Sequence, residues 1–204
     1  MNNLALTVAW EAHKHQKRKV TYSPYIVHPV EVAVILINNG ANEDQITAGL
    51  LHDTLEDTEI TLSEIMEKFG ENVARLVVGA SEPDKIELVN KLTNKQEKAS
   101  WKQRKKHTIE YLSEAPDEVK MITCADKLSN IRSMMADYKI IGNELWSTFN
   151  ANCEDQKWYY QGIVKSVADI AEYDMYQELE ANVKELFNSK NVMDFIISSR
   201  KVKK

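Results

Sequence analysis

Glycine, proline and cysteine are all scarce in this 204-residue chain, which contains six, four and two of them. So few turn-forming residues, beside many Leu, Ile, Val, Ala, Glu and Lys, argue against a sandwich or barrel of short strands and favour helices. The two cysteines, Cys124 and Cys153, form no CxxC pair and are too few for a disulfide framework or a thiolate metal site. We therefore predict a single all-α domain with reduced cysteines, of which Cys124 is buried.

Long apolar runs and an excess of positive charge are also missing. No stretch approaches the roughly eighteen consecutive apolar residues of a membrane helix, and the start of the chain lacks the regions of a signal peptide. The formal net charge of −5 gives no reason to expect nucleic-acid binding, which usually depends on a concentrated basic surface. We expect a soluble, cytoplasmic protein without a nucleic-acid or membrane partner. Whether it forms a homo-oligomer stays an open question.

Helix signals recur along the whole chain. Apolar spacing, capping boxes at Asn42/Gln45 and Thr61/Glu64, and prolines at helix starts mark most of the boundaries. In the first half of the chain we expect a helix over 3 to about 18, one from Pro29, one after Asn42 that carries His52 and Asp53 and closes at Asp57, one after Thr61 and a short one that ends at Gly79. In the second half we expect helices over about 95–112, from Pro116, through Ile170 and over about 175–187. We place a domain at 1–197 (core 4–165, C-terminal helices 166–190), a polar loop at 81–95 and a basic tail at 198–204.

The dipeptide His52-Asp53 is the strongest sign of chemistry, because two good metal ligands follow the apolar run Ala48-Gly49-Leu50-Leu51. A buried carboxylate needs a cation, hydrogen bonds or a proton to compensate for lost hydration. Asp126 raises the same question, because it lies in the most apolar helix of the chain. His28 stands at the start of the second helix and adds another imidazole. Each residue alone has an ordinary structural explanation, but together the four predict a metal site.

Two imidazoles and two carboxylates suit Mn²⁺, Fe²⁺, Zn²⁺ or Co²⁺, with positions left for water or substrate. Glu56 and Asp57 follow Asp53 by three and four residues, so at least one shares its helix face. Such carboxylates can orient or deprotonate an attacking water, or protonate a leaving group. Asn130 follows Asp126 by four residues and can offer a hydrogen-bond donor to the same cavity.

The order His28, His52-Asp53, Asp126 resembles the HD-domain metal-dependent phosphohydrolases. More narrowly, residues 4–165 resemble the hydrolase domain of RelA/SpoT proteins, above all the stand-alone small alarmone hydrolases. The motifs that carry this resemblance are Ala12-His13, Gln16-Lys17-Arg18-Lys19, Pro24-Tyr25-Ile26-Val27-His28-Pro29, Gly49-Leu50-Leu51-His52-Asp53, Glu56-Asp57-Thr58, Phe69-Gly70 and Ala125-Asp126-Lys127-Leu128-Ser129-Asn130.

The resemblance implies an all-α HD-domain helical bundle that holds one Mn²⁺, although other divalent transition metals fit the same ligands. It implies hydrolysis of the 3′-pyrophosphate of the small nucleotide (p)ppGpp to GDP or GTP plus pyrophosphate. By motif matching, the metal ligands would be His28, His52, Asp53 and Asp126, with Glu56 and Asp57 acting on the water. The substrate contacts would be Arg18 on the purine, Lys19 beside it, Asn130 on the ribose, and Arg104 and Lys105 on the distal phosphates. For Arg104-Lys105 a solvated helix face is the competing interpretation.

The sequence departs from the family pattern around the base-binding loop. His15 and Tyr22 stand where alarmone hydrolases usually have glycines, and Ser81-Glu82 replaces a usual Thr-Lys. These differences leave two alternatives open. One is an HD nucleotidase for another phosphorylated nucleotide, such as NADPH or a (deoxy)nucleotide. The other is a nucleotide-binding regulatory module without turnover, which the intact Glu56-Asp57 pair argues against.

Overall fold

The computed structural model describes residues 2–82, 97–190, 192–193 and 196. Within these residues the fold is an all-helical single domain, as the composition predicts. Its helices are α1 (Asn3–His13), α2 (Val27–Asn38), α3 (Glu43–Leu51), α4 (Thr54–Asp57), α5 (Leu62–Phe69), α6 (Glu71–Ala80), α8 (Glu97–Glu114), α9 (Asp117–Ile141), the 3-10 helix η1 (Gly142–Thr148), α10 (Cys153–Ser166), the 3-10 helix η2 (Ala168–Ile170) and α11 (Asp174–Asn188).

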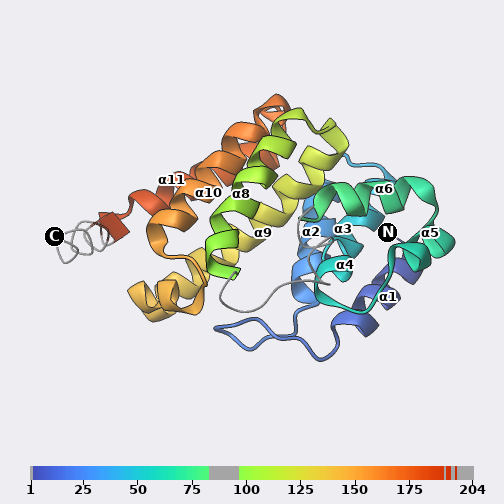
Figure 1. Ribbon diagram of the computed structural model, residues 1–204, viewed down its shortest axis with the longest axis horizontal. Helices are drawn as coiled ribbons and strands as arrows, with labels where there is room; N and C mark the ends of the chain where they lie inside the picture. The colour runs from blue at the N-terminus through green and yellow to red at the C-terminus, as the bar shows by residue number, and fades with distance from the viewer. Residues whose placement is uncertain (1, 83–96, 191, 194–195, 197–204) are drawn as a thin grey trace.

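Helix α9 is the spine of the fold. It packs against α2, α3 and α6 on one side and against α10, α11 and η1 on the other. In Figure 1 it runs between a compact group formed by α1 to α6 and a set of long helices formed by α8, α10 and α11. Residues 119–131 of α9 are almost all buried in this position, because a helix with neighbours on several sides has little solvent face. Cys124, on this helix, is buried and free as expected.

The local helix signals are confirmed where they depend on neighbouring residues. Both capping boxes form, at Asn42/Gln45 before α3 and at Thr61/Glu64 before α5. His28 is the second residue of α2, and Pro29 follows it in the first turn, where a helix tolerates proline. The described helices include none that is long and apolar enough to cross a membrane.

Three expected boundaries are wrong. Helix α1 ends at His13 instead of near residue 18, because the backbone of 16–18 instead pairs with 23–25, as in the bond from Arg18 N to Ser23 O (2.9 Å). The third helix stops at Leu51, where the Thr54 hydroxyl donates to the Leu51 carbonyl (2.6 Å), so His52 and Asp53 lie between α3 and α4. Helix α10 ends at Ser166, and a short 3-10 helix follows as far as Ile170, a common way for a helix to tighten at its C-terminus.

Two further expectations, the greater part of the polar loop 81–95 and the basic tail 198–204, lie outside the described residues. The domain limits at 1–197 stay a prediction.

Candidate metal centre and adjoining cavities

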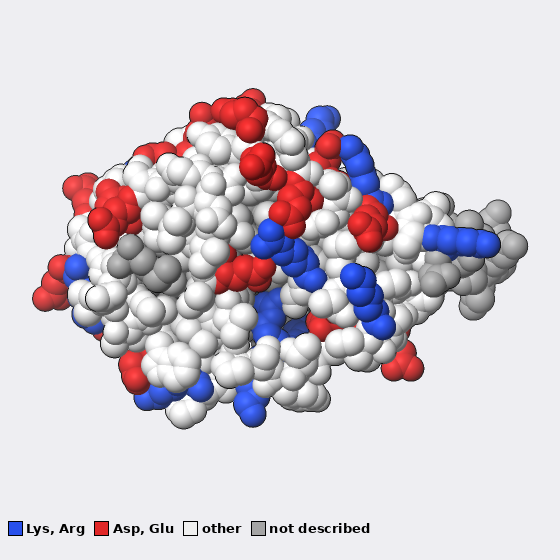
Figure 2. All heavy atoms as spheres, turned by 180° about the vertical axis from the view of Figure 1, so that it is seen from behind, with Lys and Arg blue, Asp and Glu red and all other residues white. Residues whose placement is uncertain are grey.

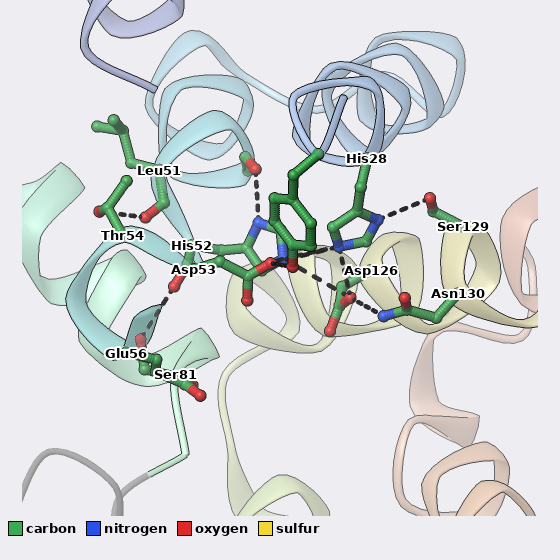
Figure 3. A network of polar contacts seen from close by, with 12 residues as sticks. His28, Leu51, His52, Asp53, Thr54, Glu56, Ser81, Asp126, Ser129 and Asn130 are labelled. Carbon is green, nitrogen blue, oxygen red and sulfur yellow. Dashed lines mark hydrogen bonds and ion pairs between the residues drawn. The ribbon is translucent and has the colours of Figure 1, made fainter. Parts of the chain in front are cut away.

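Residues far apart in the sequence meet where α2, α3 and α9 pack together. His28 comes from α2, His52 and Asp53 from the junction of α3 and α4, and Asp126 from the middle of α9. Their side chains point toward one spot (Figure 3). The fold therefore brings together all four residues that the sequence singled out, although their role as ligands stays a prediction.

The atoms that converge are the two Nε2 nitrogens and one oxygen from each carboxylate. The Nε2 atoms of His28 and His52 are 3.3 Å apart. Asp53 Oδ2 lies 3.4 Å from His28 Nε2 and 3.0 Å from His52 Nε2. Asp126 Oδ1 lies 3.2 Å and 3.6 Å from the same two nitrogens. Both imidazoles and Asp126 are buried, so water does little to screen this cluster.

Hydrogen bonds on the far side of each ring assign the tautomers. His52 Nδ1 lies 2.8 Å from the carbonyl oxygen of Gly49, which can only accept, so Nδ1 carries the hydrogen. His28 Nδ1 lies 2.8 Å from the Ser129 hydroxyl, which itself donates to Glu31 (2.7 Å), so Nδ1 donates to Ser129. Both Nε2 atoms therefore turn a lone pair toward the cluster, as in metal sites whose histidines are oriented by outer hydrogen bonds.

Two imidazole lone pairs and two carboxylates at this distance repel one another unless a positive charge lies among them. Burial acts to lower the pKa of His52, but the carboxylates of Asp53 and Asp126 outweigh it and hold that pKa well above its usual range. The site thus attracts a cation. His28, His52 and Asp126 each offer a ligand atom within 4.8 Å of the others. This buried group is consistent with a divalent metal site, and nitrogen and oxygen donors suit Mn²⁺, Fe²⁺, Zn²⁺ or Co²⁺.

Further side chains hold the two carboxylates in place. The Tyr25 hydroxyl donates to Asp53 Oδ2 (2.6 Å), while Asn130 Nδ2 and Lys127 Nζ donate to the two oxygens of Asp126 (2.5 and 2.6 Å). Burial acts to raise the pKa of Asp126, but Lys127 and the imidazoles outweigh it and keep that pKa well below its usual range. Asp126 is therefore held as a carboxylate.

One cavity opens at this cluster, and a larger cavity adjoins it. The smaller, of about 140 Å³, is lined by His52, Asp53 and Asp126, and the larger, of about 340 Å³, by Arg18 and Lys19. They share the lining residues Tyr25, Lys105, Lys127, Asn130 and Tyr159. In the space-filling view, Lys or Arg side chains stand in a hollow near the middle of one face (Figure 2). A molecule that spans both cavities would meet the His/Asp cluster at one end and a basic pocket at the other.

The two carboxylates expected to act on water are placed differently. Glu56 lines the smaller cavity beside His52 and Asp53, and its Oε1 accepts a hydrogen bond from the backbone N–H of Glu82 (2.6 Å). Asp57 is exposed, and it is not among the residues that line either cavity. The geometry therefore gives Glu56 the more direct access to a reacting group.

The expected substrate contacts gather around the larger cavity. Arg18 makes long hydrogen bonds to Asn130 Oδ1 (3.4 and 3.5 Å), and its guanidinium lies 5.9 Å from the centre of the Tyr25 ring. Lys19 Nζ donates to the Thr148 carbonyl (3.0 Å). These residues are adjacent in space, whereas their contact with a purine or ribose stays a prediction.

The basic pair on α8 does not form a solvated helix face, so that interpretation is wrong. Lys105 is largely buried, lines both cavities, forms an ion pair with Glu82 and lies over the Tyr159 ring (4.6 Å to its centre). Burial and the neighbouring charge of Lys127 lower the pKa of Lys105 to about 7. Arg104 Nε lies 3.7 Å from Glu82 and is also mostly covered.

Of the residues that depart from the family pattern, Ser81 and Glu82 line the smaller cavity, whereas His15 and Tyr22 are not among the residues that line either cavity. Tyr22 has a φ of 56°, a left-handed conformation that glycine adopts without strain. A glycine would be the ordinary choice here, as the resemblance suggested. Ser81 donates to the backbone carbonyls of Val77 and His52, and Glu82 joins the basic pair on α8.

Sequence reasoning assigned no role to several residues of the site. Ser129, Lys127 and the Tyr25 hydroxyl all contact ligand candidates, and Asp137 lines the larger cavity. Lys127 and Ser129 follow Asp126 by one and three residues, which is a signal that could have identified them. Tyr25 precedes His28 by three residues and Asp137 follows Asn130 by seven, so spacing offers a signal for these two as well, but only the folded chain shows that their side chains reach the site.

A model of the HD domain matches residues 5–152. The chain belongs to the HD-domain family. Among curated proteins, this HD-domain chain is 40% identical over 130 residues to the guanosine-3′,5′-bis(diphosphate) 3′-pyrophosphohydrolase of Aquifex aeolicus. The matched segment covers 64% of this chain and 17% of that protein. It is 36% identical over 132 residues to the GTP pyrophosphokinase rsh of Brucella melitensis, covering 65% of this chain and 16% of that protein. The HD-domain chain thus spans less than a fifth of these relatives.

Two solved structures resemble the HD-domain chain along most of its length. Listeria monocytogenes lmo0812 is 36% identical, with a TM-score of 0.67, and the match covers 84% of this chain and 100% of that one. A metazoan ortholog of SpoT, a protein that hydrolyses ppGpp, is 24% identical with a TM-score of 0.67, covering 93% and 94%. This second likeness supports the HD-domain fold alone.

Proposed function

We propose that this protein is a Mn²⁺-dependent hydrolase that removes the 3′-pyrophosphate of (p)ppGpp, giving GDP or GTP and pyrophosphate. The observation that carries the proposal is that His52, Asp53 and Asp126 of the four-residue cluster line a cavity that shares a wall with a larger, basic cavity. Homology to a guanosine-3′,5′-bis(diphosphate) 3′-pyrophosphohydrolase supports the choice of substrate.

The residues around the cluster suit the transfer of a phosphoryl group to water. A bound Mn²⁺ would lower the pKa of water and neutralise charge on the phosphoryl oxygens. Glu56 lines the smaller cavity and would accept the proton of the attacking water. The water oxygen bonds to the phosphorus attached to the ribose 3′-oxygen, that P–O bond breaks, and the 3′-oxygen takes up a proton.

The rest of the nucleotide would lie along the shared wall into the larger cavity. Lys105 and Lys127 line both cavities and would face the phosphates, Lys127 as an ammonium group and Lys105 as one when the anionic chain is bound, because a nearby negative charge raises the pKa of an amine. Arg18 and the neighbouring aromatic rings would hold the base, because a planar guanidinium stacks on a nucleobase face.

The test is anion-exchange analysis of ppGpp after incubation with Mn²⁺-loaded protein, run beside GTP, GDP and NADPH. We expect ppGpp to give GDP and pyrophosphate, and Asp53→Ala to abolish both metal binding and turnover. Glu56→Gln should keep the metal and lose about 10²- to 10⁴-fold in kcat. The exposed Glu59→Gln, three residues further along, is the matched control and should behave as the wild type.

Other outcomes would decide between the remaining functions. Phosphate release from NADPH or another nucleotide, with ppGpp untouched, would contradict the proposal and favour a nucleotidase. Saturable ppGpp binding without product after long incubation would contradict it in favour of a regulatory module.

A further inference from the structure

Asp137 is a buried carboxylate that does not belong to the cluster of His28, His52, Asp53 and Asp126. It lies on α9, is only 9% exposed and lines the larger cavity. Its Oδ1 is buried and accepts no hydrogen bond from the part of the chain that the structure describes. Burial raises the pKa of Asp137, and the nearby charge of Arg18 opposes that shift. A buried acceptor without a donor is unusual in folded proteins, and a bound ligand that donates a hydrogen bond would account for it.

The chemistry of the larger cavity limits what that ligand can be. Among the described residues that line it, Asp137 is the one carboxylate, while the charged groups around it are cations, such as Arg18, Lys19 and Lys127. The cavity also has aromatic walls, including Trp101 and Tyr160. A fitting ligand is flat, carries negative charge and presents N–H groups at the edge that meets Asp137.

We propose that Asp137 selects guanine by accepting hydrogen bonds from its N1–H and its exocyclic 2-amino group. These two donors are adjacent on one edge of guanine, and they match the two oxygens of a single carboxylate. Adenine offers one amino donor beside the N1 lone pair, which would face a carboxylate oxygen. Discrimination between the two bases is strong when the wrong base leaves a buried polar group of the site without a hydrogen-bond partner.

This inference rests on the proposed function, because it takes the larger cavity as the base site of the nucleotide. It goes further in naming the residue that sets the base, and it separates a guanine nucleotide from an adenine-containing alternative such as NADPH.

The experiment is calorimetric titration of Mn²⁺-loaded protein with GDP, IDP, XDP and ADP. We expect the wild type to prefer GDP to ADP by about tenfold or more, and to bind IDP more weakly than GDP, because hypoxanthine lacks the 2-amino group. This comparison needs no variant. Equal affinity of the wild type for GDP and ADP would overturn the inference.

Asp137→Asn adds a test by gain of function. An amide presents one acceptor and one donor, so it matches xanthine, which has N1–H beside a carbonyl oxygen. We expect D137N to prefer XDP to GDP, and Asp117→Asn, an exposed carboxylate at the start of the same helix, to keep the wild-type order. A D137N protein that melts cooperatively and keeps the wild-type order of affinities would also overturn the inference.

Hydrolysis of ppGpp by the same preparations keeps the two proposals apart. Turnover of ppGpp with no effect of Asp137 on base preference would leave the proposed function standing and remove this inference. An Asp137-dependent preference for GDP without ppGpp turnover would do the reverse.

Discussion

Ser129 is hydrogen-bonded to His28, one of the expected metal ligands, on the side of the ring that faces away from the cluster. Its hydroxyl accepts from His28 Nδ1 and donates to Glu31, and Glu31 is in turn bound by Arg132 (3.0 Å). Outer partners of this kind fix the ring and the tautomer of a ligating histidine. The orientation of His28 therefore depends on a chain of contacts that leads away from the cavity.

We predict that Ser129→Ala weakens Mn²⁺ binding by about 10- to 100-fold without unfolding the protein. Removal of the hydroxyl takes away the hydrogen-bond partner of His28 Nδ1, so the imidazole ring can turn or change tautomer. Calorimetric titration with Mn²⁺ measures the effect. Ser113→Ala, which loses only a hydroxyl bonded to a carbonyl of its own helix, is the control. An unchanged Mn²⁺ affinity in the Ser129 variant would show that Ser129 does not orient the ring.

At this scale, sequence reasoning works where burial conflicts with residue type. Asp53 and Asp126 could be singled out because a carboxylate among apolar residues needs compensation. Lys105 could not be placed with equal success, because a lysine on a polar helix usually faces solvent, and only the packing of α8 against α10 covers it. Asp137 was not singled out, although it follows Asn130 by seven residues on the same face of α9, because the spacing gives the face of the helix and not how far a cavity extends along it.

Among the elements, the contact between α2 and α3 sets the position of His52. Gly49 of α3 lies against α2, and a Cβ built at Gly49 would be 2.5 Å from Leu36 Cδ1 and 3.3 Å from Val32 Cγ1. Both neighbours are fully buried and have little room to move. The carbonyl of Gly49 is also the acceptor for His52 Nδ1, so the helix contact and the imidazole are linked.

Gly49→Ala should therefore destabilise the fold, even though alanine is the better helix former. The gain in helix propensity is about 1 kcal/mol, whereas overpacking costs about 1–3 kcal/mol. We expect a net loss of roughly 1 kcal/mol in the free energy of unfolding, measured by urea denaturation, together with weaker Mn²⁺ binding. A more stable variant would mean that Leu36 yields easily and that the two helices have spare room.

Helix boundaries show how far local signals reach. The boxes at Asn42 and Thr61 were predictable because capping involves residues three apart. The break before His52-Asp53 and the early end of α1 were not predictable. They accompany specific bonds, from Arg18 N to Ser23 O and from the Thr54 hydroxyl to the Leu51 carbonyl, which no capping pattern in the sequence indicates.

Over the whole molecule, the proposed metal cluster joins the central helix α9 to helices of the first part of the chain. Its residues come from α2, the α3–α4 junction and α9, and α9 also carries α10 and α11 on its other side. In the unfolded chain the spacing of 24 and then 73 residues disperses these groups, so the unfolded state binds the metal weakly. A ligand that binds only the folded state stabilises it in proportion to its affinity and concentration.

We predict that Mn²⁺ at a hundred times its dissociation constant raises the free energy of unfolding by about 2.7 kcal/mol, which corresponds to roughly 5–10 °C in Tm. The rise should disappear on addition of a chelator and be absent from Asp126→Ala, whereas Asp117→Ala should retain it. Thermal melting followed by circular dichroism, with and without Mn²⁺, gives the measurement. Because this readout needs no substrate, a Tm that ignores Mn²⁺ would count against metal binding at the His28, His52, Asp53 and Asp126 cluster, whatever nucleotide the cavities accept.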